Sequence, residues 1–234
     1  MSEIVAIVGQ TGSGKSTSIE GLNPKETVII GMINKPLPFR GWKKNYTGGQ
    51  GGNYTISVDS KKIVNILGFI SESKPEIKQI IIDDFQYLMS TEFMNRSNET
   101  GWEKFTDIAR HVWDVITKAR DLREDLKVIF LSHDEIITEN FQPKRKIKTI
   151  GKLLDDKVTL EGLFTVVLFT DVQKNQNEDR PRYTFITQND GTTTAKSPRD
   201  MFEEMHIPND LVNVIAKMDA YYEGEEDSNI NLNT

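Results

Sequence analysis

Cysteine is absent from this chain of 234 residues. That absence excludes a disulfide framework, zinc sites built from thiolates, and iron–sulfur clusters. Long apolar runs are absent too, because no stretch approaches the roughly 20 apolar residues that cross a bilayer. The sequence also opens without the charged-then-apolar leader of secreted proteins. We therefore expect a cytoplasmic protein that has no membrane as a partner.

Basic charge is in the minority: 29 Lys and Arg stand against 35 Asp and Glu, a net charge of −6. That balance alone counts against nucleic acid as a partner, but the charges are unevenly spread. Residues 27–58 contain four basic side chains and no carboxylate, and a second basic cluster lies in 144–152. The tail 223–234 is acidic and polar, so we expect it to be disordered.

Strands and helices alternate along the rest of the chain, which we expect to form one domain over residues 1–222. Helical spacing of apolar residues predicts helices over 60–73 and 101–122, the latter with Trp102 and Trp113 on its buried face. Apolar runs predict strands at 4–8, 27–33, 78–82, 127–132, 164–170 and 182–187. The expected fold is α/β, with a mostly parallel central sheet flanked by helices and a C-terminal antiparallel extension.

The stretch "IVAIVGQTGSGKSTSIE" carries the most specific motif. Gly9, Gly14, Lys15 and Ser16 satisfy G-x-x-x-x-G-K-[ST] between a buried strand and a predicted helix at 15–20, the context that a phosphate-binding P-loop requires. In such a loop, backbone N–H groups surround phosphate oxygens, the lysine neutralises the β- and γ-phosphates, and the serine hydroxyl binds Mg²⁺. The predicted nucleotide-binding residues are Gly9, Gln10, Thr11, Gly12, Ser13, Gly14, Lys15, Ser16 and Thr17.

Polar residues follow two other predicted strands, at the sheet edge where open α/β sheets bind ligands. Asp83 is the expected partner of Mg²⁺ together with Ser16. Asp84 is expected to orient or deprotonate the attacking water, although it could equally cap the next helix. His133, after "FLS", is a candidate sensor of the γ-phosphate, and the alternative is a merely structural histidine. Lys15, Asp83, Asp84 and His133 form the predicted catalytic set.

Two basic segments are candidates for DNA contact. "NKPLPFRGWKKNYTGGQGGNY" interleaves cations with aromatic rings, the combination that single-strand binders use, and the alternative is a substrate lid or a solvated loop. "EIITENFQPKRKIKTIGK" is predicted to be a protruding hairpin with basic residues on its returning strand, and the alternative is a solvated face. The candidate DNA contacts are Arg40, Trp42, Lys43, Lys44, Tyr46, Lys144, Arg145 and Lys146.

Four features taken in order resemble a known family: "GQTGSGKS", "IIIDDF", "LSH" and the late "RYTFITQNDGTTTAKSPRDMF". Together they look like the phage-encoded, RecA-like AAA ATPases that consist of little more than a RecA core and are grouped with single-strand-annealing recombinases. The resemblance covers most of residues 1–205. It implies a RecA-like fold, ATP with Mg²⁺, single-stranded DNA, self-association, and work beside a single-strand-binding protein in the host cytoplasm.

The sequence departs from that family in two ways. RecA-like enzymes carry a catalytic glutamate after the second strand, but here that strand runs into Ile33, Asn34 and Lys35, so hydrolysis could be slow or depend on Asp84. The sequence begins at its first predicted core strand, so we expect no N-terminal assembly segment and an oligomer that forms through the core. In RecA-like assemblies a neighbouring subunit supplies a cation, and Lys196 and Arg199 are the candidates. The alternative is a helix start, with Ser197 as its cap.

Three functions are compatible with these residues. The first is a DNA-stimulated ATPase acting in recombination, annealing or replication. The second is a P-loop kinase of a small molecule or nucleotide, which would need an acceptor pocket and an arginine-rich lid. The third is a binding module whose conformation ATP sets without significant turnover.

Overall fold

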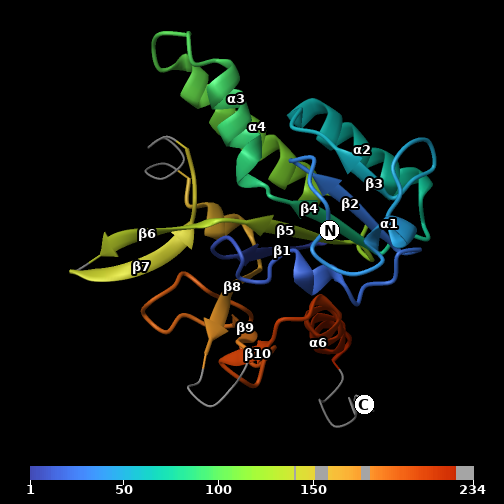
Figure 1. Cartoon of the computed structure of the whole chain (residues 1–234), viewed down its shortest axis with the longest axis vertical. Helices are drawn as coiled ribbons and strands as arrows, with labels where there is room; N and C mark the ends of the chain where they lie inside the picture. Colours follow the sequence, from blue (N-terminus) through green and yellow to red (C-terminus); the bar gives the residue numbers. More distant parts are fainter. Residues whose placement is uncertain (140, 151–157, 175–179, 225–234) are drawn as a thin grey trace.

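The computed structural model describes residues 1–139, 141–150, 158–174 and 180–224. An eight-stranded sheet runs through the middle of the molecule in the order β10-β9-β8-β1-β5-β4-β2-β3 (Figure 1). The six strands from β8 to β3 are parallel, whereas β9 runs antiparallel to both of its neighbours. The strands are β1 (Glu3–Val8), β2 (Thr27–Gly31), β3 (Tyr54–Ile56), β4 (Gln79–Asp83), β5 (Lys127–Ser132), β8 (Val166–Gln173), β9 (Arg182–Ile186) and β10 (His206–Pro208).

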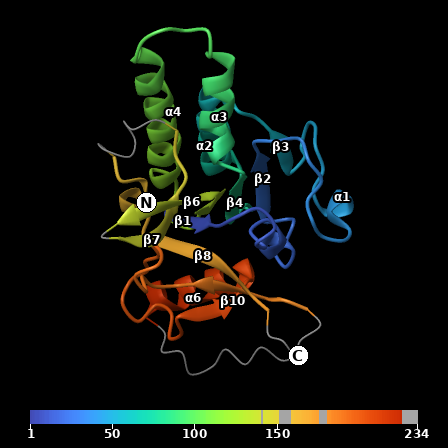
Figure 2. The same cartoon turned by 60° about the vertical axis from the view of Figure 1, so that its left-hand side comes forward.

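The inner strands are apolar on both faces because both faces are covered. Along β1, Ile4, Ala6 and Val8 belong to one hydrophobic cluster, and the alternate residues Val5 and Ile7 belong to a second. The first cluster is covered by α2 (Ser60–Ser73), α3 (Gln86–Asn95) and α4 (Glu103–Arg120), which lie together on one side of the sheet (Figure 2). The second is covered by η1 (Thr17–Ile19), the segment 37–46 with α1 (Trp42–Asn45), and α6 (Leu211–Glu223).

The strand order confirms the predicted fold class. β5 lies between β1, which leads into the phosphate loop, and β4, which ends at Asp83. This inserted strand is the arrangement of RecA-like P-loop proteins, and the pair β8–β9 begins the expected antiparallel extension. The carboxyl ends of β1, β4 and β5 consequently meet at one edge of the sheet, where open α/β sheets bind ligands.

Several local predictions were wrong. The helix expected at 15–20 is only the short 3-10 helix η1, which begins two residues after Lys15. The buried face of α4 is formed by Ile108, Val112, Val115 and neighbours, while the Trp102 and Trp113 side chains are largely exposed. Ala109, Val112 and Ile116, which the helical spacing groups with the two tryptophans, are buried as expected. The prediction of this face was therefore wrong for Trp102, which is 82% exposed, and for Trp113, which is 41% exposed.

The second basic segment forms the predicted hairpin. β6 (Asp134–Glu139) pairs antiparallel with β7 (Gln142–Ile147), and the hairpin projects from the body of the molecule (Figure 1). η2 (Leu160–Leu163) precedes β8. Glu223, the first residue of the predicted tail, is still helical, and Gly224 caps α6. Residues 225–234, and Lys152 of the second basic cluster, lie outside the described residues. In the described part of the chain, no helix is long and apolar enough to cross a membrane.

Candidate nucleotide-binding site

The phosphate loop is held against β8 by a residue that the sequence motif does not include. Thr170 Oγ1 donates to Ser13 Oγ at 2.7 Å, and Ser13 Oγ donates to the carbonyl oxygen of Gln10 at 2.6 Å. A Cβ at Gly9 would lie 1.7 Å from Thr170 Oγ1, so the loop can approach β8 only without a side chain there. Gly12 and Gly14 both have positive φ, which glycine adopts without strain.

Lys15 points back into the loop that carries it. Its Nζ donates to the carbonyl oxygens of Gly9 and Gln10, each at 2.7 Å, and the residue is 6% exposed. Burial lowers the pKa of Lys15 to about 8, although the carboxylates of Asp84, Asp134 and Asp83 act in the opposite direction. A buried cation among carbonyl dipoles at the end of β1 is suited to binding an anion.

Ser16 and Asp83 come together as predicted. Ser16 Oγ donates to Asp83 Oδ1 at 2.9 Å, joining the phosphate loop to the end of β4. Burial raises the pKa of Asp83, with repulsion from Asp84 as the next cause. One hydroxyl and one carboxylate fit Mg²⁺, which takes one or two protein oxygens and fills its other positions with water and phosphate. The described residues contain no cluster of three or more acidic, histidine or cysteine side chains that could hold a metal ion.

The Asp84 carboxylate lies between the side chains of Lys35 and His133. Lys35 Nζ lies 2.5 Å from Asp84 Oδ2, and His133 Nε2 lies 3.7 Å from Asp84 Oδ1. Burial alone would raise the pKa of Asp84, but hydrogen bonds from His133 and Lys35 outweigh it and lower that pKa. Asp84 has φ 62°, a left-handed conformation that aspartate tolerates better than most residues. Its side chain does not cap α3, so the alternative of a helix cap is wrong.

A cavity of about 790 Å³ joins these groups to the C-terminal strands. Beside the phosphate loop, Lys35, Asp84 and His133, its wall includes Tyr183 of β9 and Asn209, which follows β10. A Cβ at Gly14 would lie 3.0 Å from Asn209 Nδ2 and 3.1 Å from Tyr183 Cδ1, so both side chains touch the loop. No local motif marks Tyr183, Asn209 or Thr170, and only the pairing of β1 with β8 and of β8 with β9 brings them to the site.

The first basic segment offers fewer DNA contacts than predicted. Tyr46 is 2% exposed and packs edge-on against Phe39, so in this conformation it cannot stack on a base, and its inclusion was wrong. Trp42 is half-buried and leans on Tyr54, with Lys43 Nζ 5.8 Å from its ring. The Arg40, Lys43 and Lys44 residues are exposed.

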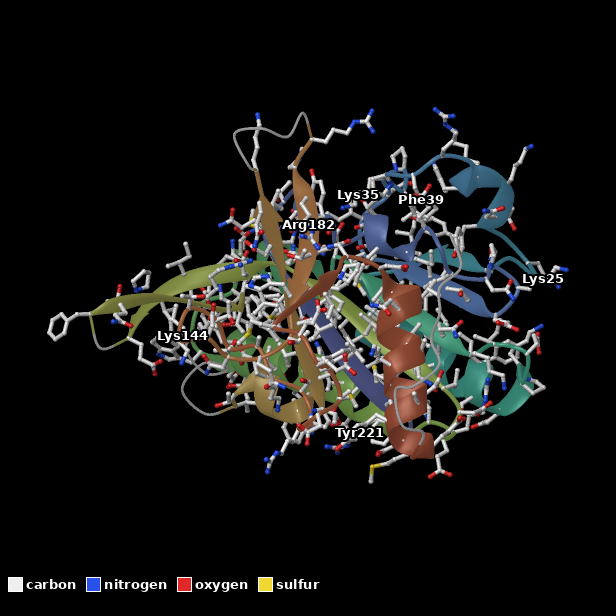
Figure 3. The ribbon with its side chains drawn as sticks, turned by 90° about the horizontal axis from the view of Figure 1, so that it is seen from below. Lys25, Lys35, Phe39, Lys144, Arg182 and Tyr221 are labelled. Carbon is white, nitrogen blue, oxygen red and sulfur yellow. The ribbon has the colours of Figure 1, made fainter. Side chains whose placement is uncertain are left out.

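The cationic side chains of the hairpin form ion pairs with acidic side chains. Lys144 pairs with Glu139 at 2.7 Å, and Lys146 pairs with Glu135 at 3.3 Å. Arg145 is structural: its Nε donates to the buried Asp134 at 2.6 Å, and its guanidinium donates to the Thr170 carbonyl oxygen. Arg145 is therefore ill-placed for DNA, whereas Lys144 lies out on the hairpin, apart from Lys35 (Figure 3).

Lys196 and Arg199 do not reach the cavity of their own chain. Lys196 pairs through its backbone with Val167 of β8. Val167 lies opposite Ala6 of β1, which is three residues before Gly9 at the start of the phosphate loop. Arg199 is 94% exposed and lies 3.6 Å from Asp200. Ser197 Oγ donates to the Thr187 carbonyl oxygen and no helix begins there, so the alternative of a helix start is wrong.

Comparison with known proteins identifies the family. Residues 2–199 match the AAA domain family. Among solved structures, the chain is similar to the KaiC-like protein PH0186 of the hyperthermophilic archaeon Pyrococcus horikoshii OT3, with 10% identity and a TM-score of 0.47, over 79% of this chain and 77% of that chain. No curated protein sequence matches significantly. Because the family match spans residues 2–199 and the phosphate loop lies within it, the chain belongs to the AAA domain family of P-loop nucleoside triphosphatases.

Proposed function

We propose that the protein binds ATP with Mg²⁺ and hydrolyses it to ADP and phosphate, and that single-stranded DNA stimulates the reaction. The observation that carries the proposal is the Ser16–Asp83 hydrogen bond, which brings the P-loop hydroxyl and the strand-end carboxylate to one point. In this reaction Lys15 would neutralise the β- and γ-phosphates, while Ser16 and Asp83 would hold Mg²⁺, which would supply charge neutralisation on the phosphate oxygens.

Asp84 is the carboxylate suited to orient the attacking water. The water oxygen bonds to the γ-phosphorus as the bond to the leaving ADP oxygen breaks, and the water proton passes to a carboxylate or to phosphate. Because hydrogen bonds lower the pKa of Asp84, it is a weak base. Turnover without DNA should consequently be slow.

Phosphate release from ATP, measured with and without single-stranded DNA, tests the proposal. We expect slow release that DNA accelerates, and Lys15→Ala should abolish both rates because the β- and γ-phosphates lose their loop cation. Undiminished turnover in Lys15→Ala would overturn the assignment of the site. Binding of ATP without release would favour a nucleotide-dependent binding module, and ADP formation only with an added acceptor would favour a kinase.

DNA contact is proposed for the exposed cations of segment 35–54, with Trp42 beside them. Binding of single-stranded DNA should quench Trp42 fluorescence, and the affinity should fall steeply with salt as counterions are released. The triple variant Trp42→Ala, Lys43→Ala, Lys44→Ala should bind markedly more weakly and with a shallower salt dependence. As a matched control, the hairpin variant Lys144→Ala reports whether the second basic segment contributes.

The cellular setting is proposed from the family resemblance. A role in phage recombination, single-strand annealing or replication in the host cytoplasm would require self-association and a single-strand-binding protein as a partner. Sedimentation with and without DNA tests self-association. A strictly monomeric active protein would exclude the cation supplied by Lys196 or Arg199 from a neighbouring subunit.

A further inference from the structure

Lys35 is a cation of the cavity that the P-loop motif does not explain. It follows β2, where its backbone N–H donates to the Ile33 carbonyl oxygen at 3.0 Å in a tight turn. Its side chain is 43% exposed and ends 2.5 Å from Asp84 Oδ2. The Lys35 ammonium group thus pairs with the buried carboxylate of Asp84, and the Lys35 side chain also lines the cavity.

Lys35 and Lys15 approach the cavity from different strands. Both line it, and repulsion from Lys35 adds to burial in lowering the pKa of Lys15, so the two charges act on the same space. Lys15 follows β1 and Lys35 follows β2, with β5 and β4 between these strands. The Lys35 side chain nevertheless reaches Asp84 at the end of β4, and the charge of Asp84 also acts on Lys15. An anion extended along this edge from the P-loop would meet Lys15 first and Lys35 beyond it.

The surrounding charges keep Lys35 protonated. Burial lowers its pKa, but the hydrogen bond to Asp84 and the charges of Asp83 and Asp84 outweigh burial and raise that pKa. An ammonium group has three N–H donors. Lys35 can therefore keep its bond to Asp84 and still donate to a phosphate oxygen.

We propose that Lys35 contacts the terminal phosphate of the bound nucleoside triphosphate, as a catalytic cation supplied by the same chain as Lys15. This rests on the proposed ATP-binding function. Asp84 is then a positioning residue for Lys35 as well as an orienter of water. A cation in the same chain would also remove the need for one from a neighbouring subunit.

The test compares ligands that differ by one phosphate. Lys35→Met should bind MgADP within about twofold of the unaltered protein, but a non-hydrolysable triphosphate at least about tenfold more weakly, because one charged hydrogen bond is lost. Turnover should fall by at least about 10²-fold. Lys35→Arg should keep most of the triphosphate preference, and Lys61→Met, which changes an exposed lysine of α2, should behave like the unaltered protein.

Equal weakening of ADP and triphosphate in Lys35→Met, or no weakening of either, would overturn the proposal. The double variant Lys35→Met, Asp84→Asn separates phosphate contact from mere neutralisation of Asp84. We expect triphosphate binding to stay weak in the double variant. Recovery to the unaltered level would mean that Lys35 only balances the buried carboxylate.

Mixing tests whether the cation and the P-loop share one chain. Lys35→Met subunits mixed with Lys15→Ala subunits should show no recovery of turnover, and recovery would contradict the proposal. The two proposals fail differently. If the unaltered protein binds no nucleotide, both the proposed function and the role of Lys35 are wrong. If the protein binds nucleotide but Lys35→Met keeps an unchanged preference for the triphosphate, only the role of Lys35 is wrong.

Discussion

At the scale of single residues, the candidate site depends on side chains forced into unusual surroundings. Lys15 is buried among carbonyl oxygens, and Asp84 adopts left-handed φ while Lys35 pairs with its carboxylate. Such arrangements cost stability unless a function requires them, and they cluster at active sites. Here they gather at the carboxyl ends of β1, β4 and β5, around one cavity.

The lowered pKa of Lys15 predicts a pH dependence of nucleotide affinity. Phosphate binds the protonated amine, and the free protein loses that proton as the pH rises through about 8. Above this pH, binding must take up a proton, so the affinity for MgADP should fall by up to about tenfold per pH unit. ADP itself has lost its last phosphate proton well below pH 8.

Calorimetry of MgADP binding between pH 7 and 9.5 checks this prediction. In buffers of different ionisation heats, proton uptake should increase across the interval. An affinity that stays constant over the whole range would show that Lys15 remains charged in the free protein.

At the scale of elements, Arg145 links the hairpin β6–β7 to the phosphate loop through Thr170. Asp134, at the base of β6, is 2% exposed in its side chain and pairs with Arg145 of β7. The Arg145 guanidinium also donates to the carbonyl oxygen of Thr170, whose hydroxyl reaches Ser13 in the loop. A displacement of the hairpin would therefore shift Thr170 and, through it, the phosphate loop.

Removing Arg145 should destabilise the fold far more than removing its neighbour. Arg145→Ala leaves the Asp134 carboxylate buried and unpaired, which costs about 3–5 kcal/mol. Lys144→Ala breaks a pair with the exposed Glu139 and should cost under about 1 kcal/mol. Urea unfolding of the two variants measures the difference, and Asp134→Asn added to Arg145→Ala should recover part of the loss. Similar costs for the two single variants would mean that the Asp134 carboxylate is not charged.

Some elements and site residues could be predicted from the sequence, and others could not. The P-loop and Asp83 were predictable because a local motif and a strand end define them. From the sequence, Lys35 stood out only because it lies where RecA-like enzymes carry a catalytic glutamate. Its bond to Asp84 could not be predicted, because that bond depends on β2 lying beside β4 and on the backbone turn at Asp84. Tyr183 and Asn209 carry no local signal at all. The helix α3 was not predicted because its apolar residues follow no regular stripe.

At the scale of the whole molecule, the cavity joins distant parts of the chain. Its walls come from the P-loop, the segment after β2, the end of β4 and the strands β9 and β10. Because β8 pairs directly with β1, the C-terminal strands and the N-terminal core share one sheet. A nucleotide should therefore stabilise the entire fold.

Thermal unfolding tests this linkage. MgADP at about 100 times its dissociation constant should add about 2.7 kcal/mol and raise Tm by about 5–10 °C. Tryptophan fluorescence and far-ultraviolet circular dichroism should report the same shifted transition, while Lys15→Ala should show no shift. Two separated transitions would show instead that the C-terminal strands unfold independently.

The two outermost strands of the sheet limit how the protein can aggregate. β3 and β10 have three residues each, and β10 ends in Pro208, which has no N–H to donate. An exposed edge recruits strands from other molecules through its unpaired backbone groups, and short edges with proline recruit poorly. Although its sheet has eight strands, the protein should resist edge-to-edge polymerisation when concentrated, so assembly would proceed through side-chain surfaces.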